Sequence, residues 1–245
     1  MISNIYNTVI YKPLYNGLIF LMDLLPWIDA GVAIIILTII VKLILFPLSK
    51  KAVVTQLKMK RVEPELNALK EKHKDDRQEL ARQTMALYKK EGLNPFLGIF
   101  LLFIQLPVIF ALYKVFLSSG LPSVNTGLLY GFVAVPAAIN IQFLGFFDIV
   151  GKSLILALIA GITTYIQIRL SMPIAPKKTT STPSKASFKE DLARSMNIQM
   201  RYIFPVLAFF ISWSISGAIA LYWITSNLFT IGQELVLRRT VKSKY

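Results

Sequence analysis

Four long apolar stretches set the strongest limit on how this chain can fold. They run from Ala30 to Leu48, from Phe96 to Phe116, from Ser153 to Leu170 and from Ile203 to Val236. A bilayer core of about 30 Å is crossed by about 20 apolar residues in a helix, and each stretch approaches or exceeds that length. Because 55% of the residues are hydrophobic and 16% are charged, lipid is expected to be the main solvent.

The last apolar stretch is too long for a single crossing. Residues 203–236 would form a helix of about 51 Å at a rise of ~1.5 Å per residue. The sequence Ser214-Ile215-Ser216-Gly217 lies inside it, and glycine and serine disfavour a continuous helix there. We therefore predict two short antiparallel spans that meet at this point.

Basic residues between the apolar stretches indicate the orientation. Residues 49–94 contain twelve Lys and Arg residues, so the positive-inside rule predicts that this loop is cytoplasmic. The uncharged segment Leu128 to Phe147 could be a sixth span, but the basic residues of 171–200 and of the carboxyl tail would then lie outside. We therefore predict five spans, with the amino terminus outside and the carboxyl terminus in the cytoplasm.

The predicted fold is an all-α polytopic membrane protein with five transmembrane helices. Residues 1–8 lack the basic start of a secretory signal, so no cleaved signal is expected. The segments, in chain order, are an N-terminal interfacial helix (1–29), span 1 (30–48), a cytoplasmic helical hairpin (49–94), span 2 (95–117), an outer-surface apolar loop (118–151), span 3 (152–171), a disordered cytoplasmic loop (172–198), span 4 (199–216), span 5 (217–236) and a basic cytoplasmic tail (237–245).

Lys42 is the one charge well inside the first apolar stretch. A charge at the centre of a membrane helix costs about 2.5 to 3.5 kcal/mol on insertion scales, which makes it a candidate functional residue. Two interpretations stay open: the side chain snorkels to the cytoplasmic surface, or it lies in a hydrated cavity. The second is favoured by polar residues in the other spans, which are Gln105, Thr163, Thr164, Gln167, Ser226, Asn227 and Gln233.

Residues typical of catalysis or metal binding are missing from the sequence. The chain has no cysteine and a single histidine, which excludes a thiolate metal site and a cysteine nucleophile. No serine stands in a recognisable nucleophile motif, and no glycine-rich phosphate loop is present. We therefore expect no catalytic residues, no metal, no cofactor and no nucleotide, and a protein that is not an enzyme.

Ordered motifs along nearly the whole chain resemble the YidC/Oxa family of membrane protein insertases. The motifs are Ile39-Ile40-Val41-Lys42-Leu43-Ile44-Leu45-Phe46-Pro47-Leu48, Leu57-Lys58-Met59-Lys60, Met85-Ala86-Leu87-Tyr88-Lys89, Asn94-Pro95, Gln105-Leu106-Pro107, Gly161-Ile162-Thr163-Thr164 with Gln167, and Leu221-Tyr222-Trp223-Ile224-Thr225-Ser226-Asn227. Two positions depart from the family pattern, since most bacterial members have arginine at the place of Lys42 and proline at the place of Ile215. Lysine keeps the charge but loses the two-pronged geometry of arginine.

The resemblance implies a groove that opens to the cytoplasm and to lipid, with Lys42 at its centre. The implied groove residues are Lys42, Gln105, Thr164, Gln167, Tyr222, Trp223, Ser226 and Asn227, and Ile109 with Phe110 would offer an apolar surface along which a substrate slides. Such a groove would reduce the cost of moving polar groups into hydrocarbon. It would attract acidic residues of incoming proteins without nucleotide or covalent chemistry.

The resemblance also implies that the cytoplasmic hairpin docks partners, whereas the residues alone favour a charged face exposed to solvent. Its candidate residues are Lys58, Lys60, Arg61, Lys70, Lys72 and Arg77. The expected partners are nascent membrane proteins, membrane lipid, the ribosome or a targeting receptor, and the Sec translocon, with no specific nucleic-acid sequence; the expected location is the cell membrane. Two other functions stay open: a small transporter or channel that uses Lys42, and a membrane-anchored ribosome receptor.

Overall fold

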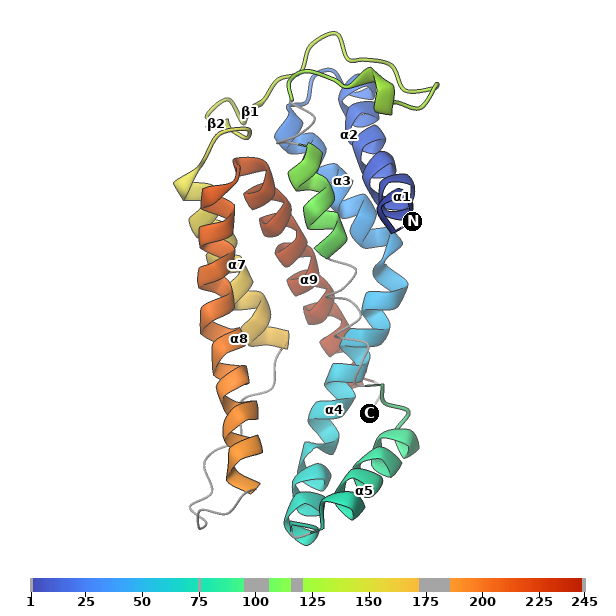
Figure 1. Cartoon of the computed structure of the whole chain (residues 1–245), viewed down its shortest axis with the longest axis vertical. Helices are drawn as coiled ribbons and strands as arrows, with labels where there is room; N and C mark the ends of the chain where they lie inside the picture. The colour runs from blue at the N-terminus through green and yellow to red at the C-terminus, as the bar shows by residue number, and fades with distance from the viewer. Residues whose placement is uncertain (1, 75, 95–105, 116–120, 172–185, 244–245) are drawn as a thin grey trace.

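The fold is mostly helical, as a computed structural model shows for residues 2–74, 76–94, 106–115, 121–171 and 186–243 (Figure 1). The elements are α1 (Ile2–Tyr6), the π-helix η1 (Asn7–Tyr11), α2 (Lys12–Leu24), α3 (Ala30–Ile44), α4 (Phe46–Lys72), α5 (Arg77–Lys90), a helix over Leu106–Val115, the 3₁₀ turn η2 (Thr126–Leu128), β1 (Gln142–Phe143), β2 (Phe147–Asp148), α7 (Leu154–Ser171), α8 (Ala186–Ser214) and α9 (Gly217–Ser243). The sequence predicted an all-α fold, and the described residues differ from it only in the two short strands.

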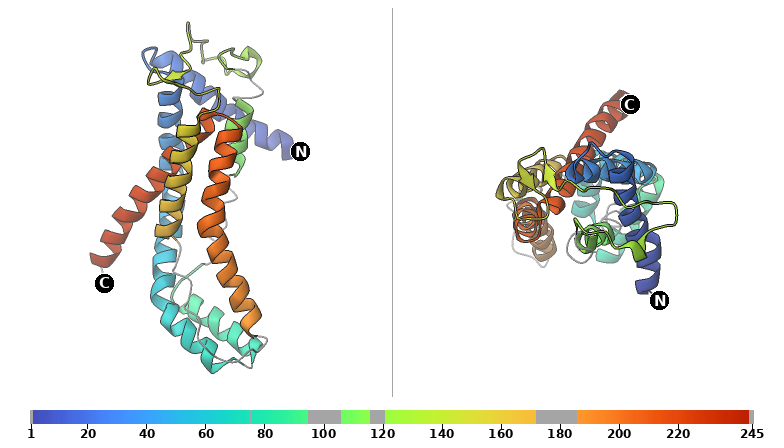
Figure 2. Two further views of the ribbon diagram at one scale, coloured as in Figure 1. Left: turned by 90° about the vertical axis from the view of Figure 1, so that its left-hand side faces the viewer. Right: turned by 90° about the horizontal axis from the view of Figure 1, so that it is seen from above.

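The long helices form an elongated bundle. Helix α7 packs against α8 and α9, and α9 also packs against α3 and α4. Figure 2 shows α9 running obliquely, with its carboxyl end projecting away from α8. Helices α7 and α8 approach closely at Gly161, where an added Cβ atom would lie 3.3 Å from the carbonyl oxygen of Pro205. Small residues at such crossings are typical of helix packing in membranes.

The first predicted span is not one straight helix. Helices α3 and α4 are separated by a bend of 67°, whereas the sequence suggested a continuous span over 30–48. Pro47 occupies the first turn of α4, a position that proline favours because it lacks an N–H group, so a new helix can begin here. Lys42 therefore lies in the last turn of α3, directly before the bend.

Helix length and composition identify few of the described helices as membrane-crossing. Helix α7 is long and apolar enough by itself, α3 and α4 meet the same criteria only as a bent pair, and the helix over Leu106–Val115 is apolar but shorter. Five spans and the orientation of the termini therefore stay predictions.

Helices α8 and α9 extend beyond the spans expected over 199–216 and 217–236. The described structure breaks between Ser214 and Gly217, at the Ser-Ile-Ser-Gly sequence where two spans were expected to meet. Helix α8 begins at Ala186, so the backbone is helical over the last part of the loop expected at 172–198, and residues 172–185 of that loop lie outside the described residues. Helix α9 continues to Ser243, so most of the predicted tail is helical as well. Both extensions follow from the absence of proline and glycine in these segments.

The segment before α7 is a loop with a small antiparallel hairpin of β1 and β2. Among the described residues 121–153, η2 is the only helical element, so segment 128–147 forms no membrane-crossing helix. Polar side chains of the first helices hold this loop in place. Asn16 accepts a hydrogen bond from the N–H of Tyr130 at 2.6 Å and donates to the carbonyl of Leu128 at 2.9 Å.

At the opposite end of the molecule, α5 folds back along α4 (Figure 1). The two helices enclose a small apolar cluster of Val62, Leu87 and Leu93. Asp76 caps α5 by accepting a hydrogen bond from the N–H of Glu79 at 3.0 Å. Side chains far from the bundle thus fix the shape of this hairpin.

Glu79 gives the hairpin a pH-dependent contact. Hydrogen bonds from Arg82 and Gln83 hold the pKa of Glu79 at about 2, below its ordinary value of 4.5. A lowered carboxyl pKa stabilises the fold above pH 4.5, and this stabilisation is lost as the pH falls from there toward 2. We expect Arg82→Ala to raise the pKa of Glu79 toward 4.5, measured by NMR titration of labelled glutamate. An unchanged titration would show that the contact with Arg82 does not form.

Candidate functional site

Lys42 contacts α9 from the last turn of α3. Its Nζ atom donates a hydrogen bond to Oγ1 of Thr230 at 3.4 Å, which is long for such a bond. Thr230 in turn donates to the carbonyl of Ser226 at 2.8 Å. Lys42 is partly exposed, and the ion pairs found among the described residues do not include it. Its charge is therefore held by a neutral hydroxyl and is open to a further partner.

Helix α9 carries polar residues on the side that faces α3 and α4. Ser226, Thr230 and Gln233 follow one another at intervals of four and three residues, which places them on one helix face. Gln233 is buried and bonds with Ser49, donating from Nε2 at 2.8 Å. Two polar contacts, Lys42 with Thr230 and Ser49 with Gln233, therefore lie on either side of the bend between α3 and α4.

A second polar face of α9 points toward α7. Asn227 is buried and its Nδ2 atom donates to the hydroxyls of Thr164 at 2.8 Å and Thr163 at 3.2 Å. Both threonine hydroxyls donate to the carbonyl of Ala160. The amide is thereby fixed between the two helices, as expected for polar residues that join helices in a membrane.

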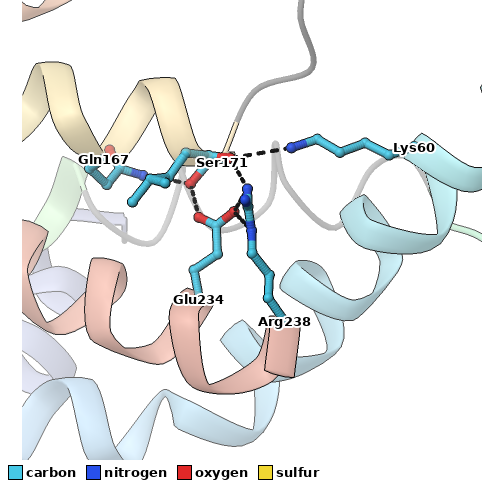
Figure 3. A network of polar contacts seen from close by, with 6 residues as sticks. Lys60, Gln167, Ser171, Glu234 and Arg238 are labelled. Carbon is cyan, nitrogen blue, oxygen red and sulfur yellow. Dashed lines mark hydrogen bonds and ion pairs between the residues drawn. The ribbon is translucent and has the colours of Figure 1, made fainter. Parts of the chain in front are cut away.

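A cluster around Glu234 joins α4, α7 and α9 (Figure 3). The Glu234 carboxylate is 2% exposed. It accepts hydrogen bonds from Ser171 Oγ at 2.5 Å and from Arg238 Nη2 at 2.7 Å. A carboxylate that is buried in this way needs such partners. Arg238 and Ser171 therefore stabilise the packing of α9 at this point.

Two cations of the same cluster cap the end of α7. Lys60 donates to the carbonyl of Leu170 at 3.2 Å, and Arg238 donates to the same oxygen. The last carbonyls of a helix have no partner within it and favour positive charge. Gln167 completes the cluster by donating to Ser171 at 3.3 Å. We call these six residues, Lys60, Gln167, Leu170, Ser171, Glu234 and Arg238, the Glu234 cluster.

Two of the predicted groove residues, Asn227 and Thr164, are joined by a side-chain hydrogen bond. Lys42 contacts Thr230, whose hydroxyl donates to the backbone carbonyl of Ser226 within the same helix. Gln167 lies in the Glu234 cluster instead of beside Lys42.

Other predicted groove residues lie elsewhere. Tyr222 and Trp223 are buried in the main apolar core. Gln105 lies outside the described residues. On the helix over Leu106–Val115, Ile109 is half-buried against the core and Phe110 is 60% exposed.

The predicted docking residues on α4 and α5 have different surroundings. Arg61 and Lys72 are exposed, and Lys58 and Lys70 are partly exposed. Lys60 is bound to α7 in the Glu234 cluster, so this lysine joins helices within the chain. The side chain of Arg77 lies outside the described part of the structure.

Sequence reasoning missed Glu234, Arg238 and Ser171 as members of one cluster. A signal was present, since Glu234 is the acidic residue at the end of the last span and Arg238 follows it by one helical turn.

Among the described residues, no group of three His, Cys, Asp or Glu side chains could hold a metal ion. The assembled groups are hydroxyls, amides, cations and the Glu234 carboxylate.

Comparison with known proteins connects these features to one family. The model of the 60Kd inner membrane protein family matches residues 21–244. A Clostridium tetani protein named membrane protein insertase YidC is 31% identical over 214 residues, which cover 87% of this chain and 84% of the relative. A protein of the same name from Clostridium acetobutylicum is 35% identical over 221 residues, with 87% and 75% covered.

Some relatives are much longer than this chain. A protein of Wolinella succinogenes, also named membrane protein insertase YidC, is 29% identical over 244 residues, which are 98% of this chain but 39% of the relative. This chain therefore spans less than half the length of that relative, and the region that matches the family model includes α3 to α9.

Proposed function

We propose that this protein integrates other membrane proteins into the bilayer and helps them fold, because the chain belongs to the 60Kd inner membrane protein family. It is a membrane protein, and its relatives carry the name insertase. The observation that carries the proposal is the Lys42 ammonium group, held between α3 and α9 by Thr230. No acidic side chain among the described residues neutralises it.

In this proposal, Lys42 attracts acidic residues of an incoming chain. The polar face of α9 around Ser226 and Thr230 would lie in a hydrated groove open to the cytoplasm, which lowers the cost of moving polar groups out of water. A hydrophobic segment of the substrate would leave along apolar residues such as Ile109 and Phe110, the second of which is exposed. This transfer uses neither nucleotide nor a covalent intermediate.

The proposed arrangement in the cell membrane has five spans, with the amino terminus outside and the carboxyl terminus in the cytoplasm. Helices α4 and α5 would then lie in the cytoplasm, and their exposed residues, such as Arg61 and Lys72, would meet the ribosome, a targeting receptor or the Sec translocon. Nascent membrane proteins are the proposed substrates.

Reconstitution tests the proposal. The purified protein in liposomes should insert a short single-span substrate with an acidic translocated tail, measured by protection of the tail from added protease. Empty liposomes are the control, and the same vesicles are tested for flux of small solutes. Insertion no greater than in empty liposomes would contradict the proposal. Saturable solute flux without insertion would indicate a transporter instead.

A further inference from the structure

The loop before α7 lies at the end of the molecule opposite α5 (Figure 1), and it exposes large apolar side chains. Residues 121–147 contain no Asp, Glu, Lys or Arg. Within this segment Phe132 is 77% exposed and Phe146 is 84% exposed, and Trp27, in the neighbouring turn between α2 and α3, is 77% exposed. A loop surrounded by water is normally polar, so this exposure points to a different solvent.

The tip of the β1–β2 hairpin carries an apolar residue where the backbone favours a polar one. Leu144 has a φ of 54° and Gly145 a φ of 76°. Tight hairpin turns with two positive φ angles favour Asn-Gly or Asp-Gly, because a bulky residue is strained there. Leu144 is nevertheless present and 60% exposed. The tip therefore carries an apolar side chain although its backbone conformation favours Asn, Asp or Gly.

The hairpin is fixed at the start of α3. Asp29 accepts hydrogen bonds from the N–H of Val32, at the start of α3, and from the N–H of Leu144, at the hairpin tip. Phe143 packs so tightly on Gly31 that an added Cβ atom would lie 2.5 Å from its ring.

The chain after the hairpin is fixed at the start of α9. Gly217 and Ala218 donate their N–H groups to the carbonyls of Gly151 and Ile149, both at 2.8 Å. Helix α7, the described helix that can cross a membrane by itself, begins at Leu154. The exposed tip therefore has a fixed position where three helices of the bundle begin.

We propose that the hairpin tip, with Phe132 and Trp27, is embedded in the lipid leaflet at this end of the protein. Aromatic side chains are enriched at the boundary between headgroups and hydrocarbon, where apolar loops and helices also bind. Helix α7 begins a few residues after the hairpin, and its first residues Leu154 and Ile155 are both more than half exposed. Because residues 121–147 carry no charged side chain, the binding of this segment does not depend on anionic lipid.

The embedded tip anchors the bundle at a fixed depth. It is attached to α3 through Asp29, so it fixes how deep the amino end of that helix lies in the bilayer. Lys42 is on the same helix, and its depth is set by this attachment. The anchor is independent of the proposed insertion function, since it requires only that the bundle lies in a membrane.

Single-cysteine variants test this position, because the chain has no cysteine of its own. A nitroxide label is attached at Phe146→Cys or Phe132→Cys, with Lys152→Cys and Lys72→Cys as polar controls; all four side chains are exposed. In vesicles of phosphatidylcholine and phosphatidylglycerol, EPR measures collisions with oxygen and with a water-soluble nickel chelate. We expect the oxygen-to-nickel ratio at positions 146 and 132 to exceed that at the controls several-fold.

A second variant separates embedding from misfolding. Leu144→Asn suits the positive φ angle but removes the apolar tip, so it should lower the oxygen-to-nickel ratio at position 146 while the protein stays folded. Ratios at positions 146 and 132 equal to those at the controls would overturn the proposal. Strong dipolar broadening between labels would overturn it as well, since it would show that a second copy of the chain covers the tip.

Discussion

Replacing Arg238 with alanine is expected to lower the free energy of unfolding by about 3 kcal/mol. The change leaves the Glu234 carboxylate, which is 2% exposed, without its cationic partner, and breaking a buried ion pair from one side costs about 3 to 5 kcal/mol. The lower figure applies because the Arg238 side chain is 30% exposed and water screens part of the interaction. Thermal or denaturant unfolding in detergent measures the loss.

Arg239 provides the matched control for this variant. It is the next residue on α9 and is exposed, so Arg239→Ala should change stability little. Replacing Glu234 and Arg238 together by leucine should be less harmful than Arg238→Ala, because no buried charge is left without a partner. Equal stability of the Arg238 and Arg239 variants would contradict the role assigned to the Glu234 cluster.

Lys42→Ala is expected to slow insertion of a substrate with an acidic tail about ten- to hundredfold. Hydrogen bonds to charged groups contribute about 1.5 to 3 kcal/mol, and about 1.4 kcal/mol corresponds to a factor of ten. Lys42→Arg should preserve insertion, since it keeps the charge beside Thr230. Protease protection of the translocated tail measures the rate in liposomes.

Two controls separate charge attraction from general damage. A substrate whose tail is neutral should lose much less when Lys42 is replaced, because the attraction is electrostatic. Lys50→Ala changes an exposed lysine on α4 and should leave insertion unchanged. If Lys42→Ala inserts acidic substrates as fast as the unchanged protein, the side chain snorkels to the surface and has no part in the mechanism.

Much of the helical framework could be predicted from the sequence. The apolar stretches correspond to α3, α7, α8 and α9, because long runs of apolar residues are the strongest sequence signal for helices in a membrane protein. The break between Ser214 and Gly217 was also predictable, since its residues disfavour a continuous helix. Lys42 and Asn227 were identifiable because polar groups are costly in hydrocarbon.

The bend and the Glu234 cluster could not be predicted in the same way. Pro47 is tolerated at a helix start, so sequence alone does not show whether the chain bends there or continues. The cluster joins residues far apart in the chain, such as Lys60 and Leu170, and their proximity depends on how α4, α7 and α9 cross. Lys60 was interpreted as a docking residue because of the family resemblance, and the competing interpretation of the charge run was a face exposed to solvent.

Disulfide trapping of a substrate at the Lys42 site tests the central claim most directly. Thr230→Cys and Leu228→Cys lie two residues apart on α9, and Leu228 is 54% exposed. The substrate carries one cysteine in its acidic tail, and oxidation is applied during insertion into liposomes. We predict that the tail is trapped at position 230 several-fold more than at position 228. Efficient insertion with equal trapping at both positions, or with trapping only at position 228, would contradict passage of the substrate beside Lys42.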